Sequence, residues 1–147
     1  MGGFRISKVG DWARAQRAMF LLSSADLRKP LKAMGEHVLL RVSDAFQEET
    51  SPSGEKWKPS ERAAARKRGK TLVQTGRLRA SVAYEVHGDE LHVGTNLVYG
   101  AIHNFGGETG RRDARFEMPK RTFLELTDGD RDEFGSIMGD FLGELVE

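Results

Sequence analysis

The chain has 147 residues, a length typical of one domain, and we expect a single domain over residues 1–147. Hydrophobic residues make up 38% of it and charged residues 31%, which predicts a small core that gains part of its order from neighbouring subunits. The absence of cysteine excludes disulfides, thiolate metal sites and a cysteine nucleophile, and it fits a reducing cytoplasm. No apolar run approaches the roughly 18 residues of a membrane span, so we expect no membrane contact.

Charge is distributed unevenly, although the net charge is only +1. Between Lys56 and Arg79, nine basic residues stand against one acidic residue. Between Leu124 and Glu147, eight acidic residues stand against one basic residue. This separation suits nucleic-acid binding by the basic segment, and it suits head-to-tail packing between copies equally well.

Apolar residues recur at helical spacing in two segments near the N-terminus. The first runs from Asp11 to Leu22, inside an N-terminal helical segment of residues 1–25. The second carries an unbroken apolar stripe from Leu27 to Phe46, which predicts a helix of about six turns at 3.6 residues per turn. The turn Ser51-Pro-Ser-Gly54 ends this helix and begins a basic loop region over residues 51–79.

The second half of the chain mixes short elements with one helix. Ser60 is expected to cap a short basic helix that runs to Arg68. Residues 82–86 and 91–95 alternate with a period of two and are joined by a turn at Gly88-Asp89, which predicts a hairpin. Residues 122–126 are a candidate third strand. A capped start at Thr127 opens an amphipathic helix that reaches Val146. We therefore expect an α+β fold with long N-terminal helices and this C-terminal helix packed on a small antiparallel sheet.

One segment, Tyr99-Gly-Ala-Ile-His-Asn-Phe-Gly-Gly107, combines a histidine with two aromatic residues and three glycines. It holds either a catalytic histidine or a specific architectural turn. A histidine base needs an orienting acid and a nucleophile or substrate nearby, and the segment has no acid before Glu108. We favour the turn, with His103 on a short helix, holding the Gly106-Gly107 loop by a hydrogen bond. The protein is then not an enzyme and has no catalytic residue; a hydrolase using His103 is the competing hypothesis.

The other chemical motifs are weak. The histidines form no HxxxH or HExxH pair, and His87 and His92 could meet only across an exposed hairpin, so we expect no metal site. The glycines of residues 106–110 lack the lysine of a phosphate-binding loop, so we expect no cofactor. The basic run from Arg62 to Lys70 either binds phosphates or faces solvent or a partner. Trp57 is expected to anchor this loop to the core.

Four motifs in a fixed order resemble one protein family. They are Ser51-Pro-Ser-Gly-Glu-Lys-Trp57, Leu72-Val-Gln-Thr-Gly-Arg-Leu-Arg-Ala-Ser-Val82, Val93-Gly-Thr-Asn-Leu-Val-Tyr-Gly-Ala-Ile-His-Asn-Phe-Gly-Gly107 and Met118-Pro-Lys-Arg-Thr-Phe-Leu124. This order resembles the phage virion morphogenesis family of Mu-type tailed phages, also described as tail-completion or neck proteins. The resemblance runs from about Leu31 to the C-terminus. Asn104 stands where the family typically has glutamine, and Thr122 stands where it has proline.

The resemblance implies a structural virion protein of the neck or tail end, without enzymatic activity. It implies a homo-oligomeric ring of six copies that joins the finished tail to the DNA-filled head. The expected partners are the adjoining head-connector and tail-tube or terminator proteins, with non-specific contact to DNA that passes through the ring. The protein would be assembled in the bacterial cytoplasm and reside in the virion. A tail terminator, a head-side connector and a nucleic-acid-binding module that uses residues 56–79 remain as alternatives.

The resemblance also assigns roles to residues. It implies a turn at Thr75-Gly76 that feeds the first strand, packing of a short helical turn against the sheet, a tight reversal at two glycines, and an exposed extension over residues 110–115. The motif residues concerned are Trp57, Gly76, Tyr99, His103, Phe105, Gly106, Gly107 and Phe123. The residues expected to contact partners, among them the acidic C-terminal region of a neighbouring copy, are Arg62, Arg66, Lys67, Arg68, Lys70, Arg111, Arg112 and Arg115.

Overall fold

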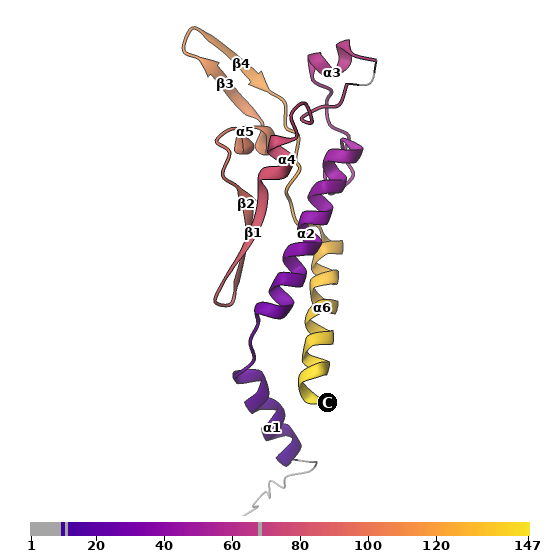
Figure 1. Ribbon diagram of the computed structural model, residues 1–147, viewed down its shortest axis with the longest axis vertical. Helices are drawn as coiled ribbons and strands as arrows, with labels where there is room; N and C mark the ends of the chain where they lie inside the picture. The colour runs from indigo at the N-terminus through magenta and orange to yellow at the C-terminus, as the bar shows by residue number, and fades with distance from the viewer. Residues whose placement is uncertain (1–9, 11, 68) are drawn as a thin grey trace, which may run out of the picture.

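The computed structural model describes residue 10 and residues 12–147 except residue 68. Within these residues the chain is elongated, and helices α2 and α6 run side by side along its long axis (Figure 1). The elements in chain order are α1 (Trp12–Ser23), α2 (Arg28–Glu48), α3 (Glu61–Ala65), α4 (Arg77–Ser81), β1 (Val82–His87), β2 (Glu90–Thr95), α5 (Gly100–Phe105), β3 (Gly107–Arg111), β4 (Ala114–Met118) and α6 (Asp128–Val146). The expected α+β class is confirmed, although these strands form two separate two-stranded sheets.

Helix α2 is the main wall of the core. Its apolar stripe follows the helical spacing of the sequence, so one side of the helix is removed from water. The buried side chains of this stripe are Leu31, Met34, Val38, Val42, Ala45 and Phe46. Phe46 meets the ring of Trp57 edge-on at 5.4 Å between centroids, and it meets Phe123 at 5.2 Å. The indole Nε1 of Trp57 donates to the carbonyl of Thr122 at 2.9 Å, which fixes the loop after α2 to the segment before α6.

Helix α6 is held antiparallel to α2 by polar contacts. Its start is capped as expected: the Thr127 hydroxyl accepts from the Asp130 amide at 3.2 Å, and the Asp130 carboxylate accepts from the Thr127 amide at 2.8 Å. The same carboxylate forms a hydrogen bond with Nε2 of His37 at 2.7 Å and an ion pair with Nε of Arg41 at 3.3 Å. Further along, Lys29 and Glu144 form an exposed ion pair.

The β1–β2 hairpin packs against α2, as the period of two predicts. The strands pair antiparallel, with Val82 opposite Thr95 and His87 opposite Glu90. The ring of Tyr84 lies so close to α2 that a Cβ on Gly35 would stand 2.6 Å from it. The Tyr84 hydroxyl donates to Glu36 at 2.8 Å. Glycine on α2 is therefore what lets the sheet approach the helix.

Four expectations need correction. The candidate strand at residues 122–126 is not a strand, because its backbone groups bind side chains of other segments. A hairpin that the sequence did not indicate, β3–β4, lies at residues 107–118. Helix α4 intervenes between the Thr75-Gly76 turn and β1. Helix α3 starts after Ser60, whose hydroxyl accepts from the Ala63 amide as expected, but it ends at Ala65. The expected end of that helix, Arg68, lies outside the described residues.

Helix α1 follows the expected helix closely but buries none of its residues. Asp11, its expected first residue, lies outside the described residues. Met19 and Phe20 are each 70% exposed, because α1 touches the body only near the C-terminal end of α6. None of the helices in the described residues combines the length and the apolar character needed to span a bilayer.

Asp130 makes the stability of the fold depend on pH. Burial alone would raise the pKa of Asp130, but the hydrogen bonds from Thr127 and His37 and the charge of Arg41 outweigh burial and lower it from 3.8 to about 2. This difference corresponds to about 2 kcal/mol of stability, present above pH 4 and lost as the pH falls towards 2. We expect Asp130→Asn to lower the free energy of unfolding at pH 7 by about 2 kcal/mol and to remove that part of the acid dependence.

Urea denaturation between pH 2 and pH 7 measures this effect. Asp132→Asn, an exposed position on the same helix, is the matched control and is expected to leave the stability curve unchanged. Equal acid sensitivity of wild type and Asp130→Asn would show that Asp130 does not carry the dependence.

Candidate functional site

A buried asparagine organises the segment that follows the first hairpin. Asn104 lies on α5 and is 5% exposed. Its Oδ1 accepts from the amides of Phe123 and Leu124, both at 2.9 Å, and its Nδ2 donates to the carbonyl of Leu124 at 3.1 Å. Its carbonyl accepts from the hydroxyl of Thr122 at 3.0 Å. Residues 122–124, which we call the strap, are thereby fixed beside α5 without a strand partner.

The chain reverses directly after α5. The amide of Gly106 donates to the carbonyl of Ile102, and Gly106 has a φ of +70°. A Cβ at Gly106 would stand 2.8 Å from the amide nitrogen of Lys120, so glycine is required for both the backbone angle and the close approach. The carbonyl of His103 accepts from the amide of Arg121 at 2.8 Å. These contacts set the direction in which the β3–β4 hairpin leaves the body.

His103 does not hold this turn by its side chain, which corrects the expected hydrogen bond to the glycine loop. Its Nδ1 is buried and has no hydrogen-bond partner, and the ring meets Tyr99 edge-on at 6.1 Å. Burial and the nearby charge of Arg121 lower the pKa of His103, so the ring is neutral at pH 7. Among the described residues no carboxylate hydrogen-bonds to the ring, so the structure supplies no orienting acid for a base at this position.

One of the two aromatic residues around α5, Phe105, is not packed as expected. Phe105 is 73% exposed and Tyr99 is 41% exposed, so the expectation that both pack the turn against the sheet is wrong for Phe105. Instead α5 approaches β2 through Gly100, where a Cβ would stand 2.4 Å from the side chain of Thr95. Gly100 and Asn104 thus occupy the buried side of α5, and the ring of Phe105 is exposed on the other side.

An open groove of about 800 Å³ lies between the loop that carries α3 and the base of the β3–β4 hairpin. Its lining includes the apolar side chains of Leu72, Leu78, Tyr99, Phe116 and Met118, together with two prolines, and His103 also faces it. Three exposed cations, Lys58, Arg62 and Lys70, line it as well. Arg121 lines its inner side and donates from Nε to the carbonyl of Lys58 at 2.7 Å. Two acids, Glu61 and Glu117, line the groove too, so it combines aromatic surface with a small excess of positive charge.

The model of the phage virion morphogenesis family matches residues 6–143. The chain belongs to this family. It is also 38% identical over 81 residues to the Mu-like prophage FluMu G protein 2 of Haemophilus influenzae. That match covers 55% of the chain and 58% of the relative, so the chain spans a little over half of that relative's length. No solved structure matches the chain.

Membership in the phage virion morphogenesis family supports a structural role in the virion and a virion-associated location. The family also suggests a structural, non-enzymatic protein. For a structural protein of this kind, the functional residues are those on the surface that contact other molecules.

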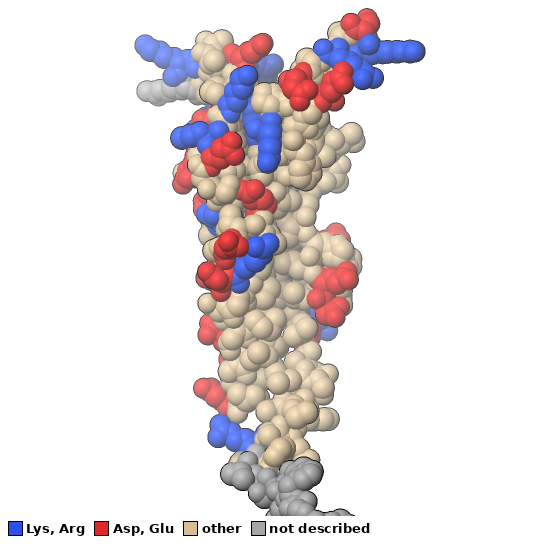
Figure 2. All heavy atoms as spheres, turned by 180° about the vertical axis from the view of Figure 1, so that it is seen from behind, with Lys and Arg blue, Asp and Glu red and all other residues tan. Residues whose placement is uncertain are grey.

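The structure of this virion protein gathers the basic candidate residues at one end of the molecule. Arg62, Arg66, Lys67 and Lys70 belong to α3 and the loop after it, whereas Arg111, Arg112 and Arg115 belong to the β3–β4 hairpin. Figure 2 shows Lys and Arg side chains over both parts at the upper end. Lys70 also donates to the carbonyl of Gln47 at 3.0 Å. Arg68 lies outside the described residues.

Two groups of exposed acidic residues lie away from the basic end of the molecule. α6 exposes Asp132, Glu133 and Asp140 along the body. The tip of the β1–β2 hairpin exposes Asp89 and Glu90, and it forms an acidic patch at the edge of Figure 2. Sequence reasoning found the acidic helix but missed the acidic hairpin, although residues 80–110 contain four acidic residues and no Lys or Arg. It also missed Asn104, whose role depends on contacts with the distant strap.

Asn104 is the residue on which the site geometry depends. Asn104→Ala leaves two buried amides and one carbonyl of the strap without partners, so we expect a loss of about 3 kcal/mol in the free energy of unfolding. Asn104→Asp retains the acceptor and removes the donor, and it should fall between wild type and Asn104→Ala. Chemical denaturation measures both. Asn96→Ala, at an exposed asparagine, is the control, and an equal effect at Asn96 would contradict the assignment.

Proposed function

We propose that the protein is a ring-forming subunit at the neck or tail end of a phage particle, which completes the tail and joins it to the head. The observation that carries this proposal is the position of the exposed apolar side chains. Met19 and Phe20 are exposed on α1, which lies at one end of the molecule, and Phe105 of α5 and Phe116 of β4 are exposed on elements nearer the other end (Figure 1). Exposed apolar surface of this kind marks interaction sites.

Two different surfaces at opposite ends favour a ring over a simple dimer. A symmetric dimer uses the same patch twice, whereas a contact between unlike patches repeats from copy to copy and closes into a ring when the rotation allows it. The distribution of charge supports such a contact. The candidate basic residues lie at the upper end, where acidic side chains are interspersed, while further acidic residues are exposed on α6 and at the β1–β2 tip. Six copies, and head-connector and tail-tube or terminator proteins as neighbours, follow from the family resemblance.

Imaging of particles tests the location. We expect electron cryo-microscopy of particles assembled with this chain to show it as a closed ring between head and tail. Mature particles without any density for the chain would refute the proposal. A ring found at the tail-tube end alone would identify a tail terminator, and a ring found on the head portal alone would identify a head-side connector.

Charge reversal in the basic loop tests whether this end takes part in assembly. We expect Arg66→Glu combined with Lys67→Glu to lower the yield of complete particles about tenfold or more, because each reversed charge at an interface costs on the order of a kcal/mol or more. Both side chains are exposed, so the circular dichroism spectrum of the purified variant should be unchanged. Lys32→Glu, exposed on α2, is the comparison and should leave the yield unchanged. Unchanged yield for the loop variant would remove this loop from the assembly surface.

A nucleic-acid-binding role is the second candidate, and the groove favours it. The rings of Tyr99 and Phe116 and the cations Arg62 and Lys70 line one groove, a combination typical of sites that bind single strands. If this role holds, gel shifts should show binding near physiological ionic strength. Arg62→Glu with Lys70→Glu should then reduce the slope of affinity against salt by about 2. Lys32→Glu, exposed on α2, is the control. Absence of binding at that ionic strength rejects the candidate.

A further inference from the structure

The β3–β4 hairpin has almost no core of its own. None of the residues in its two strands is buried, and Phe116 on β4 is 54% exposed. A lone two-stranded hairpin is marginally stable in water. No other strand of the described residues pairs with either of its outer edges. The hairpin, which we call the arm, therefore has the properties of an element that is completed by another molecule.

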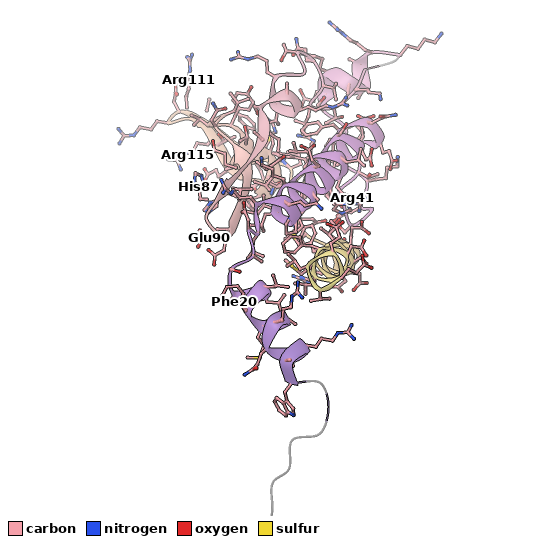
Figure 3. All side chains as sticks on the ribbon, turned by 60° about the horizontal axis from the view of Figure 1, so that its bottom comes forward. Phe20, Arg41, His87, Glu90, Arg111 and Arg115 are labelled. Carbon is pink, nitrogen blue, oxygen red and sulfur yellow. The ribbon has the colours of Figure 1, made fainter. Side chains whose placement is uncertain are left out.

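The tip of the arm is positively charged. Arg111, Arg112 and Arg115 are exposed there, and Figure 3 shows Arg111 and Arg115 on the same projecting element. Arg115 lies 3.5 Å from the carboxylate of Glu108, a weak exposed pair. The side chains of Arg111 and Arg112 form no ion pair or hydrogen bond within the described residues. The strands of the arm also expose Glu108 and Glu117, and Asp113 lies in the turn. At the tip, residues 110–115, three arginines stand against that one acid, so the excess positive charge of the arm is confined to its tip.

The acidic surface best suited to this tip is the tip of the β1–β2 hairpin. Glu85, Asp89 and Glu90 are exposed there. The carboxylates of Glu85 and Glu90 contact only His87 and His92, each at 2.9 Å, and Asp89 has no polar partner in the described part of the chain.

Half of the six acids of α6 are already engaged within the chain. Asp128 pairs with Arg131, Glu144 pairs with Lys29, and Asp130 is buried. The other three, Asp132, Glu133 and Asp140, are exposed but spread along a helix that also carries Arg131. Asp89 and Glu90 are instead adjacent on a projecting turn, in a segment, residues 80–110, that contains no Lys or Arg.

The two tips of one chain point in opposite directions along the molecule (Figure 1). We propose that the basic tip of the arm docks on the acidic tip of the β1–β2 hairpin of a second copy. This inference rests on the proposed ring. The contact joins unlike surfaces, so each copy gives its arm to one neighbour and receives an arm from the other. The exposed ring of Phe116 lies on the same arm and adds apolar area to a contact that charge orients.

Introduced cysteines test this contact directly, because the chain has none of its own. Full-length chain that carries both Arg112→Cys and Asp89→Cys is produced in cells that assemble particles, and the particles are oxidised mildly. We expect a ladder of disulfide-linked oligomers on a non-reducing gel. Either single variant should stop at dimers. The pair Arg112→Cys and Asp132→Cys, which places the second thiol on α6, is the matched control and should give no ladder.

A charge exchange provides the second readout. Arg111→Glu with Arg112→Glu should lower the yield of complete particles about tenfold, and so should Asp89→Arg with Glu90→Arg. All four substitutions together should restore the yield to within about threefold of wild type, because every contact then pairs opposite charges again.

The outcomes separate this inference from the proposed function. Chain present in particles without a ladder, and with no rescue by the fourfold exchange, overturns the docking but leaves the ring. A chain absent from particles overturns the ring itself. Loss of DNA retention in the arginine variant without rescue assigns the arm to DNA and also overturns the docking.

Discussion

The buried amide of Asn104 is the contact on which the arrangement of the other elements depends. It satisfies three backbone groups of the strap, which has no strand beside it. The strap in turn presents the carbonyl of Thr122 to the indole of Trp57 and places Phe123 against Phe46. Without the amide the strap would bury unpaired backbone groups, at a cost larger than the gain from its aromatic contact. One polar side chain therefore joins α5, the basic loop and the aromatic core.

The strap divides the molecule into a packed body and projecting parts. The body is α2, the β1–β2 hairpin and α6, held by the aromatic core and by the capped, ion-paired start of α6. α1, α3 and the β3–β4 arm contribute one buried side chain between them, Ala63, to this packing. A small core thus supports several exposed elements, as the low hydrophobic fraction indicates. Such elements gain their remaining stability from the molecules they contact.

The sequence predicts the body well and the projecting parts poorly, for a physical reason. The stripe of α2 and the alternation of residues 82–95 reflect burial on one face, and burial is what periodicity records. The arm buries no residue in either strand, so its sequence carries no alternation to detect. Residues 122–126 resemble a strand because they are apolar and extended, but their partner is the side chain of Asn104, about 20 positions away.

The same reasoning applies to the candidate site. The exposure of the basic residues follows from their chemistry, but the fold alone brings residues 62–70 and 111–115 to the same end. His103 drew attention as a histidine among glycines, yet the turn needs its backbone carbonyl and not its ring. The neighbouring Asn104 carries the structural role because an amide can donate and accept at once, which a single neutral imidazole nitrogen cannot do. The polar groups of residues 99–107 therefore stabilise the fold. The fold in turn holds the charged tips of the two hairpins apart, where they are exposed for contact with other molecules.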